Sequence, residues 1–264
     1  MVEYCQNNRG QHMSIEGFQP ISVKPPSRSP ILFWIRCRID LQLGSIVKYL
    51  RPAMSDLHGR ILDLGAGESP WRDWMPEGCL YQGIDVENSQ EYGMNIERQE
   101  IIYYDGKIIP FPKSSFDGAI CIEVLEHVEN PDEFVSEISR VLKKGSILLL
   151  TVPWSARRHH IPHDYHRFTR ERLARLFEEN GFDNVDIRER GTEIGTIASK
   201  LVVLTIRLLK PKRTANMFWT VPIAVIFAPA VAALLAAAHI SDAIGRGSRE
   251  DPLGYFVRAV CSAS

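Results

Sequence analysis

The chain lacks the features of small disulfide-rich or zinc-stabilised folds and of strongly charged nucleic-acid-binding proteins. Its five cysteines are scattered over 264 residues and form no Cys-x-x-Cys pair. Neither a disulfide framework nor a zinc ribbon is expected, and the thiols should be reduced, as in cytosolic proteins. The 31 basic and 32 acidic residues give a formal net charge of −1. No nucleic-acid partner is predicted, because a protein that grips phosphates needs an excess of basic residues.

A secretory signal is also missing. The first 30 residues contain four prolines and no apolar core, so residues 1–30 are predicted to be a flexible leader. Residues 31–55 follow with an apolar face broken by several charges. This pattern favours a packing helix over a membrane span, interrupted at Gly44 and ended before Pro52.

Residues 56–193 are predicted to form the main domain, because short apolar runs alternate there with helical stretches. Such alternation predicts a parallel sheet with helices on both faces. The expected strands are 60–64, 80–85, 100–104, 117–122, 146–152 and 184–190, and the expected helices are 131–143 and 169–180.

The composition changes over residues 194–250, which are predicted to be a hydrophobic insertion. The segment 217–240 contains 24 residues without a formal charge, and about 20 apolar residues suffice to span a bilayer. Residues 251–264 contain the closing strand of the domain, so the chain must return to the side from which it left. We therefore expect a helical hairpin in the membrane interface, with a soluble lid or dimer surface as the alternative.

Basic residues accompany this insertion and favour an anionic membrane surface as a partner. No acidic residue opposes them between residues 194 and 216. Juxtamembrane cations of this kind are attracted to anionic cytoplasmic lipids. The residues concerned are Lys200, Arg207, Lys210, Lys212 and Arg213.

A glycine turn follows the first predicted strand and indicates a ligand site. Gly65 and Gly67 permit a tight turn and a close approach of a ligand to the backbone. About twenty residues further on, Asp85 ends the next strand, where a carboxylate can accept hydrogen bonds from both ribose hydroxyls. A dinucleotide fingerprint would need glycine at position 70, where this chain has proline. The pattern therefore favours a nucleoside ligand without a pyrophosphate cradle.

Four segments in order, ILDLGAGESP, YQGIDV, YYDGKIIPFPKSSFDGAICIEVLEHV and SRVLKKGSILLLTVP, resemble the motifs of class I S-adenosylmethionine-dependent methyltransferases. The branch that they resemble most includes the ubiquinone and menaquinone biosynthesis enzymes. The resemblance implies an enzyme with S-adenosyl-L-methionine as its cofactor. It also implies an α/β fold, with a Rossmann-like, seven-stranded, mostly parallel, doubly wound sheet whose last strand is antiparallel.

The same resemblance implies roles for individual residues. The glycine turn would approach the methionine end of the cofactor, with Asp63 orienting its amino group. Asp85 would bind the ribose, Asp105 the adenine amino group, and the end of the fourth strand would contact cofactor and acceptor. The expected cofactor-binding residues are Asp63, Gly65, Ala66, Gly67, Asp85, Val86, Asp105, Gly106, Ile122 and Glu123.

Histidines near the carboxyl edge of the predicted sheet are candidates for the acceptor side. A hydroxyl acceptor is helped by a general base as the methyl group is transferred. We expect His163 to act as this base with Asp164 as its orienting partner, and His127 is a further catalytic candidate. The spacing of the cluster RRHHIPHDYHRFT at 157–169 matches no recognisable zinc site, so no metal is predicted.

The phrase PHDYHRFT, with the apolar tail, resembles methyltransferases of bacterial surface-polysaccharide biosynthesis. We therefore expect O-methylation of a glycan or lipid-linked intermediate, by a cytoplasmic protein associated with the inner face of the plasma membrane. One alternative is a prenylated quinone-like or other small-molecule acceptor. A second is a cofactor-binding scaffold without catalysis. The pattern leaves the oligomeric state open.

Overall fold

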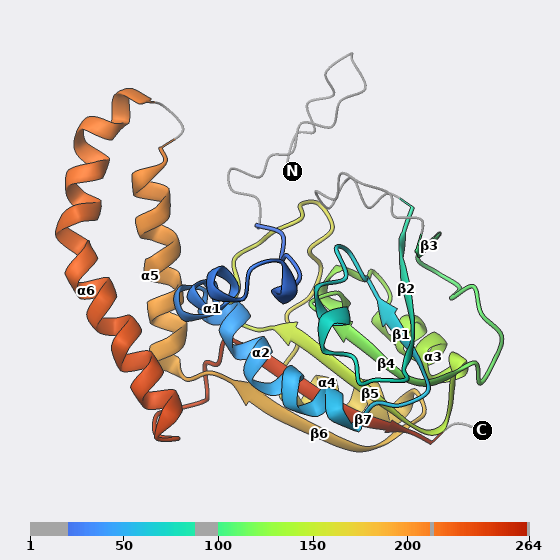
Figure 1. The fold of residues 1–264 in the computed structure, drawn as a ribbon. Coiled ribbons are helices and arrows are strands. Elements are labelled where there is room, and N and C mark those ends of the chain that lie inside the picture. The colour runs from blue at the N-terminus through green and yellow to red at the C-terminus, as the bar shows by residue number, and fades with distance from the viewer. Residues whose placement is uncertain (1–20, 88–99, 212–213, 263–264) are drawn as a thin grey trace, which may run out of the picture.

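The structure, a computed structural model, describes residues 21–87, 100–211 and 214–262. Its centre is a seven-stranded sheet in the order β3-β2-β1-β4-β5-β7-β6 (Figure 1). The strand β7 is antiparallel to both neighbours, and the pairs from β3 to β5 are parallel. This arrangement confirms the predicted fold class. The strands are β1 (Arg60–Leu64), β2 (Leu80–Val86), β3 (Ile101–Tyr104), β4 (Phe116–Ile122), β5 (Leu142–Pro153), β6 (Phe182–Arg190) and β7 (Gly254–Cys261).

Helices cover both faces of the sheet. On one face, α3 (Pro131–Val141) and α4 (Arg170–Glu179) bury Phe134, Ile138 and Phe177 in the larger core cluster. On the other face, α2 (Leu41–Ala53) packs its apolar side into a second cluster. Short 3-10 helices connect these elements: η1 (Pro26–Arg28), η2 (Met54–Asp56), η3 (Pro70–Trp74), η5 (Leu125–His127) and η6 (Thr214–Asn216).

The N-terminal helical region differs from the prediction. It breaks at Asp40, between α1 (Pro30–Ile39) and α2, because the Asp40 side chain accepts a hydrogen bond from the Leu43 N–H and so caps α2. Gly44 continues α2, and a side chain there would clash with the carbonyl oxygen of Cys37. Pro52 lies inside the last turn of α2 rather than beyond it. Most of the packing predicted for this region belongs to α2, whereas α1 contributes only the half-buried Phe33 and Cys37 to the second core cluster.

The apolar insertion forms a helical hairpin that projects from the domain (Figure 1). It consists of α5 (Glu193–Leu209) and α6 (Met217–Ala243). Ala198 and Ala238 pack at its base with Leu41 and Leu253, so both ends of the hairpin are attached to the sheet domain. Lys212 and Arg213 lie outside the described residues.

A buried arginine at the end of β6 joins the central strands. The guanidinium of Arg190 is fully buried, and its Nη2 donates to the Val152 carbonyl at 3.0 Å and to Glu123 Oε1 at 2.8 Å. Its Nε donates to the Tyr255 carbonyl at 3.2 Å. These bonds connect the ends of β4, β5, β6 and β7, and a side chain at Gly254 would clash with the guanidinium.

Replacing this arginine should destabilise the fold strongly. Removing one partner of a buried ion pair leaves the other uncompensated, so Arg190→Met should lower the free energy of unfolding by about 3–5 kcal/mol. Arg188→Met is the matched control, because Arg188 pairs with Asp186 at the surface and should change stability by about 1 kcal/mol or less. Chemical denaturation of both variants measures the difference. Equal midpoints would contradict this role of Arg190.

Candidate active site

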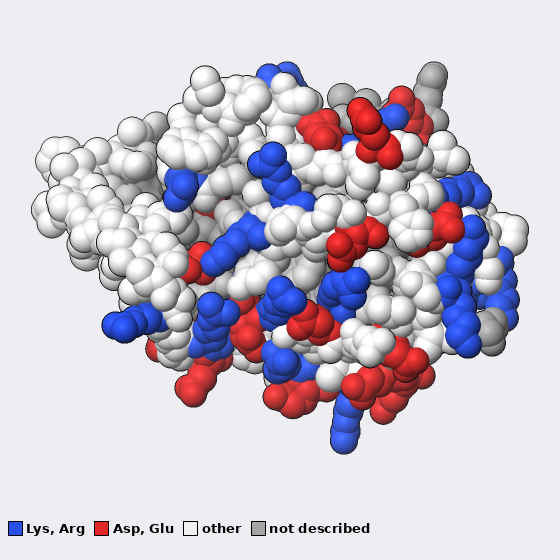
Figure 2. Space-filling view, turned by 60° about the horizontal axis from the view of Figure 1, so that its bottom comes forward, with Lys and Arg blue, Asp and Glu red and all other residues white. Residues whose placement is uncertain are grey.

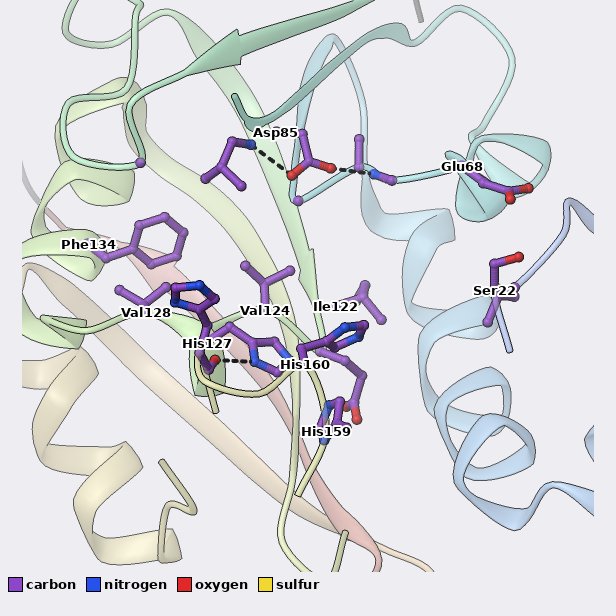
Figure 3. Close-up of a pocket in the computed structure, with 18 of the residues that line it drawn as sticks. Ser22, Glu68, Asp85, Ile122, Val124, His127, Val128, Phe134, His159 and His160 are labelled. Carbon is purple, nitrogen blue, oxygen red and sulfur yellow. Dashed lines mark hydrogen bonds between the residues drawn. The ribbon is translucent and has the colours of Figure 1, made fainter. Parts of the chain in front are cut away.

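A cavity of about 700 Å³ lies at the carboxyl ends of the parallel strands. It opens beside β1, which pairs with β2 on one side and β4 on the other. The order of the strands reverses between β1 and β4. Open α/β sheets bind their ligands at such switch points. The residues that line the cavity include two groups (Figure 3). We call them the turn wall, formed by Gly65–Gly67, Asp85, Val86, Asp105 and Gly106, and the histidine wall, formed by His127, His159, His160 and His163.

The glycine turn is built as its sequence predicts. The N–H groups of Gly65 and Ala66 both donate to the Ile84 carbonyl, each at 3.0 Å. Gly65 has a φ of +68°, and a side chain there would clash with Val124. Only glycine accommodates both the positive φ and the close approach of Val124. Because no side chain covers position 65, the backbone of the turn is exposed to the cavity.

Asp85 is oriented by two backbone donors. Its Oδ2 accepts from the Gly67 N–H at 2.9 Å and its Oδ1 from the Val86 N–H at 2.8 Å. Burial raises the pKa of this carboxyl, and the two N–H bonds act in the opposite direction. Each carboxylate oxygen has a further lone pair with which it can accept a hydrogen bond from a ligand hydroxyl.

Asp63 does not have the position expected of a residue that contacts the cofactor. Its side chain is buried below the turn, where Oδ2 accepts a hydrogen bond from the Tyr81 hydroxyl at 2.6 Å. Burial raises the pKa of Asp63 to about 7. The structure does not place Asp63 among the residues that line the cavity, and its contact with the cofactor stays a prediction.

The remaining predicted cofactor residues all line the cavity. Asp105 and Gly106 follow β3, and Oδ1 of Asp105 accepts from the N–H groups of Lys107 and Ile108, which lowers the pKa of this carboxyl. Ile122 and Glu123 end β4 and also line the cavity. Glu123 is held by Arg190, a contact that the sequence did not indicate.

The histidine wall brings together residues from two loops. His127 lies in η5 after β4, whereas His159, His160 and His163 lie in the loop after β5. Nδ1 of His127 is 2.7 Å from the His163 carbonyl oxygen. Burial, followed by the proximity of His159, lowers the pKa of His127 to about 3, and burial lowers that of His160 to about 4. Both imidazoles are therefore neutral at neutral pH.

The predicted pairing of His163 with Asp164 is not formed. Both carboxylate oxygens of Asp164 accept hydrogen bonds from Arg167, and Oδ2 also accepts from the backbone N–H of His159. His163 instead contacts the Tyr165 hydroxyl, which lies 3.1 Å from its Nδ1. Asp164 therefore shapes the loop, whereas His163 and His127 line the cavity.

Part of the predicted leader also lines the cavity. Ile21, Ser22 and Val23 contribute to its wall, and Arg36 holds this segment through the carbonyls of Ile21 and Ser22. Lys24 forms an ion pair with Glu68 beside the glycine turn. The predicted flexible leader is therefore wrong for residues 21–29. No local pattern could reveal contacts between residues so far apart in the chain.

The comparison with known families agrees with this geometry. A family described as a methyltransferase domain matches residues 37–187, which include the glycine turn, Asp85 and the histidine wall. The chain belongs to the S-adenosylmethionine-dependent methyltransferases. S-adenosylmethionine is the cofactor of this methyltransferase, and the residues present fit it: the cavity has a suitable volume, an exposed glycine backbone and an oriented carboxylate at the end of β2.

Curated relatives share only part of their length with this methyltransferase. A tRNA (carboxymethyluridine(34)-5-O)-methyltransferase of Arabidopsis thaliana is 30% identical over 36% of this chain and 24% of the relative. A fatty-acid O-methyltransferase of Mycolicibacterium smegmatis is 29% identical over 38% of this chain and 39% of the relative. The mitochondrial ubiquinone biosynthesis O-methyltransferase of Dictyostelium discoideum is 29% identical over 34% of this chain and 29% of the relative.

A solved structure supports the fold. The S-adenosylmethionine-dependent methyltransferase from Archaeoglobus fulgidus superposes with a TM-score of 0.50, at 17% identity, over 88% of this chain and 99% of that chain. At this identity the likeness concerns the fold alone.

A substitution at the glycine turn should separate steric contact from backbone strain. Gly65→Ala should lower the free energy of unfolding by about 2–5 kcal/mol, because a left-handed alanine is strained and its methyl group clashes with Val124. Gly78→Ala is the matched control, since Gly78 has a φ of +83° with open space around it, and it should cost only about 1–2 kcal/mol. Thermal and chemical denaturation measure both. Equal losses would show that contact with Val124 does not determine the turn.

Proposed function

We propose that this methyltransferase O-methylates a glycan or lipid-linked acceptor at the inner face of the plasma membrane. The observation that carries the proposal is the combination of a two-walled cavity with an exposed apolar hairpin on the same domain. The turn wall suits the cofactor, the histidine wall suits a hydroxyl acceptor, and the hairpin suits a lipid surface.

We assign the cofactor to the turn wall. Asp85 accepts hydrogen bonds from the ribose hydroxyls, and Val86 lies beside it. Asp105 and Gly106 lie on the adenine side, and the backbone of Gly65, Ala66 and Gly67 lies beside the methionine part. The bound cofactor supplies a methyl group already activated on a sulfonium, so the protein has chiefly to align acceptor and methyl group.

The acceptor is assigned to the histidine wall. The carbonyl of His163 can only accept a hydrogen bond, so Nδ1 of His127 carries the proton and its Nε2 carries the lone pair. A neutral imidazole of this kind can take the proton of an acceptor hydroxyl as the methyl group is transferred. His163, beside the Tyr165 hydroxyl, is the second candidate for this base.

The apolar hairpin supports a membrane site. Within the described part of the chain, only the helix Thr214–Ala243 has the length and apolar composition to cross a membrane: its mean hydropathy is 2.4, and 17% of its most apolar window is buried. Figure 2 shows the visible side of this projection as a surface largely without charged side chains. Large apolar residues are exposed here and on the neighbouring helix α1, including Phe218, Trp219, Ile226, Ile31 and Trp34. A hydrogen bond between the His239 ring and the Arg38 carbonyl joins α6 to α1.

The connection of the hairpin to the sheet argues against a single crossing. The chain leaves β6 into α5 and returns from α6 to β7, which pairs with β5 and β6. Two crossings would carry Lys200 and Arg207 of α5 through the bilayer, at about 2.5–3.5 kcal/mol for each residue placed centrally. We therefore propose that the hairpin lies in the interface or enters one leaflet, with its basic residues near anionic headgroups.

The relatives favour an oxygen acceptor with an apolar part. One is named a fatty-acid O-methyltransferase and another a ubiquinone biosynthesis O-methyltransferase. The second name supports a prenylated quinone-like acceptor as the alternative, which would use the same hairpin. The proposal of a glycan acceptor rests on the resemblance of the PHDYHRFT segment and of the apolar stretch that follows it to methyltransferases of surface-polysaccharide biosynthesis.

Cofactor binding tests the turn wall. Asp85→Ala should weaken the binding of S-adenosylhomocysteine by about 1–3 kcal/mol, because the ribose hydroxyls lose their acceptor. Asp186→Ala, which removes a carboxylate from a surface ion pair, should leave the affinity unchanged. Isothermal titration calorimetry compares the two variants with the unmodified protein. An Asp85→Ala affinity equal to that of the control would remove the ribose assignment.

Vesicle binding tests the hairpin. The protein should co-sediment with vesicles containing anionic lipid and bind neutral vesicles less. Ile226→Glu should weaken this binding about tenfold or more, since it removes an apolar side chain worth about 1.5–3 kcal/mol on burial and adds a charge. Leu80→Glu, on an equally exposed position of β2, serves as the control. Identical sedimentation of both variants would exclude the hairpin as the membrane contact.

A further inference from the structure

Three imidazoles of the histidine wall converge on one point of the cavity. His127 comes from η5, and His159 and His160 come from the loop after β5 (Figure 3). One ring nitrogen of each lies within 4.8 Å of one nitrogen of both others. We propose that these three residues bind a divalent transition-metal ion of the zinc class, with the carboxylate of Glu126 beside it.

Backbone carbonyls orient two of the rings for this role. Nδ1 of His127 lies 2.7 Å from the His163 oxygen, and Nδ1 of His159 lies 3.1 Å from the Arg157 oxygen. Because a carbonyl only accepts, each Nδ1 carries the proton and each Nε2 carries the lone pair. Histidines that bind metals commonly hold their other ring N–H in such a bond. The arrangement therefore presents two ligand nitrogens whose tautomers are already selected.

Glu126 provides an independent indication. Its side chain is fully buried, and neither carboxylate oxygen has a hydrogen-bond partner among the described residues. Oε1 lies 3.6 Å from Nε2 of His127 and 3.9 Å from Nε2 of His159. A cation held by the imidazoles would compensate the buried carboxylate.

The ligand types indicate which metal. Imidazole nitrogens favour zinc and its neighbours, whereas Mg²⁺ and Ca²⁺ prefer oxygen ligands. Tetrahedral zinc, with bonds of about 2.0–2.1 Å, holds its ligand nitrogens about 3.4 Å apart. From separations of up to 4.8 Å, the ring nitrogens would need to close by at most about 1.4 Å. Three protein ligands leave a coordination position open toward the cavity, as in catalytic zinc sites.

The site lies on the acceptor side of the cavity, and its use rests on the proposed function. An acceptor oxygen bound at the open position would lose its proton more readily. His127 would then be a ligand, and His163 would be the residue left to take the proton. Metal binding itself does not depend on this role, so the two can be tested separately.

The experiment uses tag-free full-length protein that has been treated with a chelator and dialysed. Titration with Zn²⁺ should show one ion bound per chain, and Co²⁺ should bind in its place and give the visible absorption bands of a low-coordinate site. Mg²⁺ should not displace either ion. His127→Gln, His159→Gln and His160→Gln should each weaken Zn²⁺ binding at least tenfold. His58→Gln, an exposed histidine outside the cavity, should leave it unchanged.

Two further measurements keep the outcomes distinct. Glu126→Gln preserves the size of the side chain and should weaken Zn²⁺ binding by removing the charge. Binding of S-adenosylhomocysteine is measured for every variant. It shows whether the cofactor side of the cavity is intact, independently of Zn²⁺ binding. Stoichiometric Zn²⁺ without S-adenosylhomocysteine binding would support the metal site and count against the proposed function. Normal S-adenosylhomocysteine binding, with Zn²⁺ absent or equally bound by the cavity variants and His58→Gln, would overturn the metal site.

Discussion

The buried guanidinium of Arg190 is the interaction on which the site depends. It is fully buried and donates hydrogen bonds to carbonyls of β5 and β7, to the carboxylate of Glu123 at the end of β4, and to the Ser45 hydroxyl of α2. An uncompensated charge in this position would be very costly, so these strand ends must remain together. Glu123 is followed within four residues by Glu126 and His127. The ion pair between Arg190 and Glu123 therefore helps to hold the segment that carries His127.

The turn wall, on the other side of the cavity, is positioned by backbone conformation and backbone hydrogen bonds rather than by an ion pair. A left-handed glycine at position 65 lets the chain turn sharply against Val124, and Asp85 is aimed by two backbone N–H groups. This methyltransferase therefore combines a turn wall held by the backbone with a histidine wall in which His127 and His160 are neutral, at the switch point of its sheet. The hairpin is attached beside this domain through a small apolar cluster that includes Leu253 at the entry to β7. Packing at the base of the hairpin thus connects α5 and α6 to β7, the strand between β5 and β6.

Local patterns sufficed for much of the fold. The strands and the glycine turn were predicted because apolar alternation, helix-capping residues and turn glycines act over a few neighbouring residues. The antiparallel last strand was implied by the resemblance to class I methyltransferases. Predictions that depended on side-chain direction were less successful. Asp63 was expected in the site but turns beneath it toward Tyr81, and Asp164 was expected to orient His163 but binds Arg167. Closeness in the sequence did not predict these partners. The side chains of Tyr81 and Arg167 also lie within hydrogen-bond reach of the two carboxylates, and they form the bonds.

The sequence by itself determined the fold class, the cofactor and the edge of the sheet that carries the site. Local spacing indicated a nucleoside ligand and the sheet edge, through glycines after a strand, a carboxylate at the end of the next and polar loops after parallel strands. The resemblance of four motifs to class I methyltransferases implied the cofactor and the seven-stranded sheet. Only the tertiary structure decided that residues 21–23 close the cavity, that Arg190 holds Glu123, and that His127 meets His159 and His160. These contacts join residues far apart in the chain. They exist because the buried sheet brings its strand ends to one edge, where long-range burial and charge compensation select the partners.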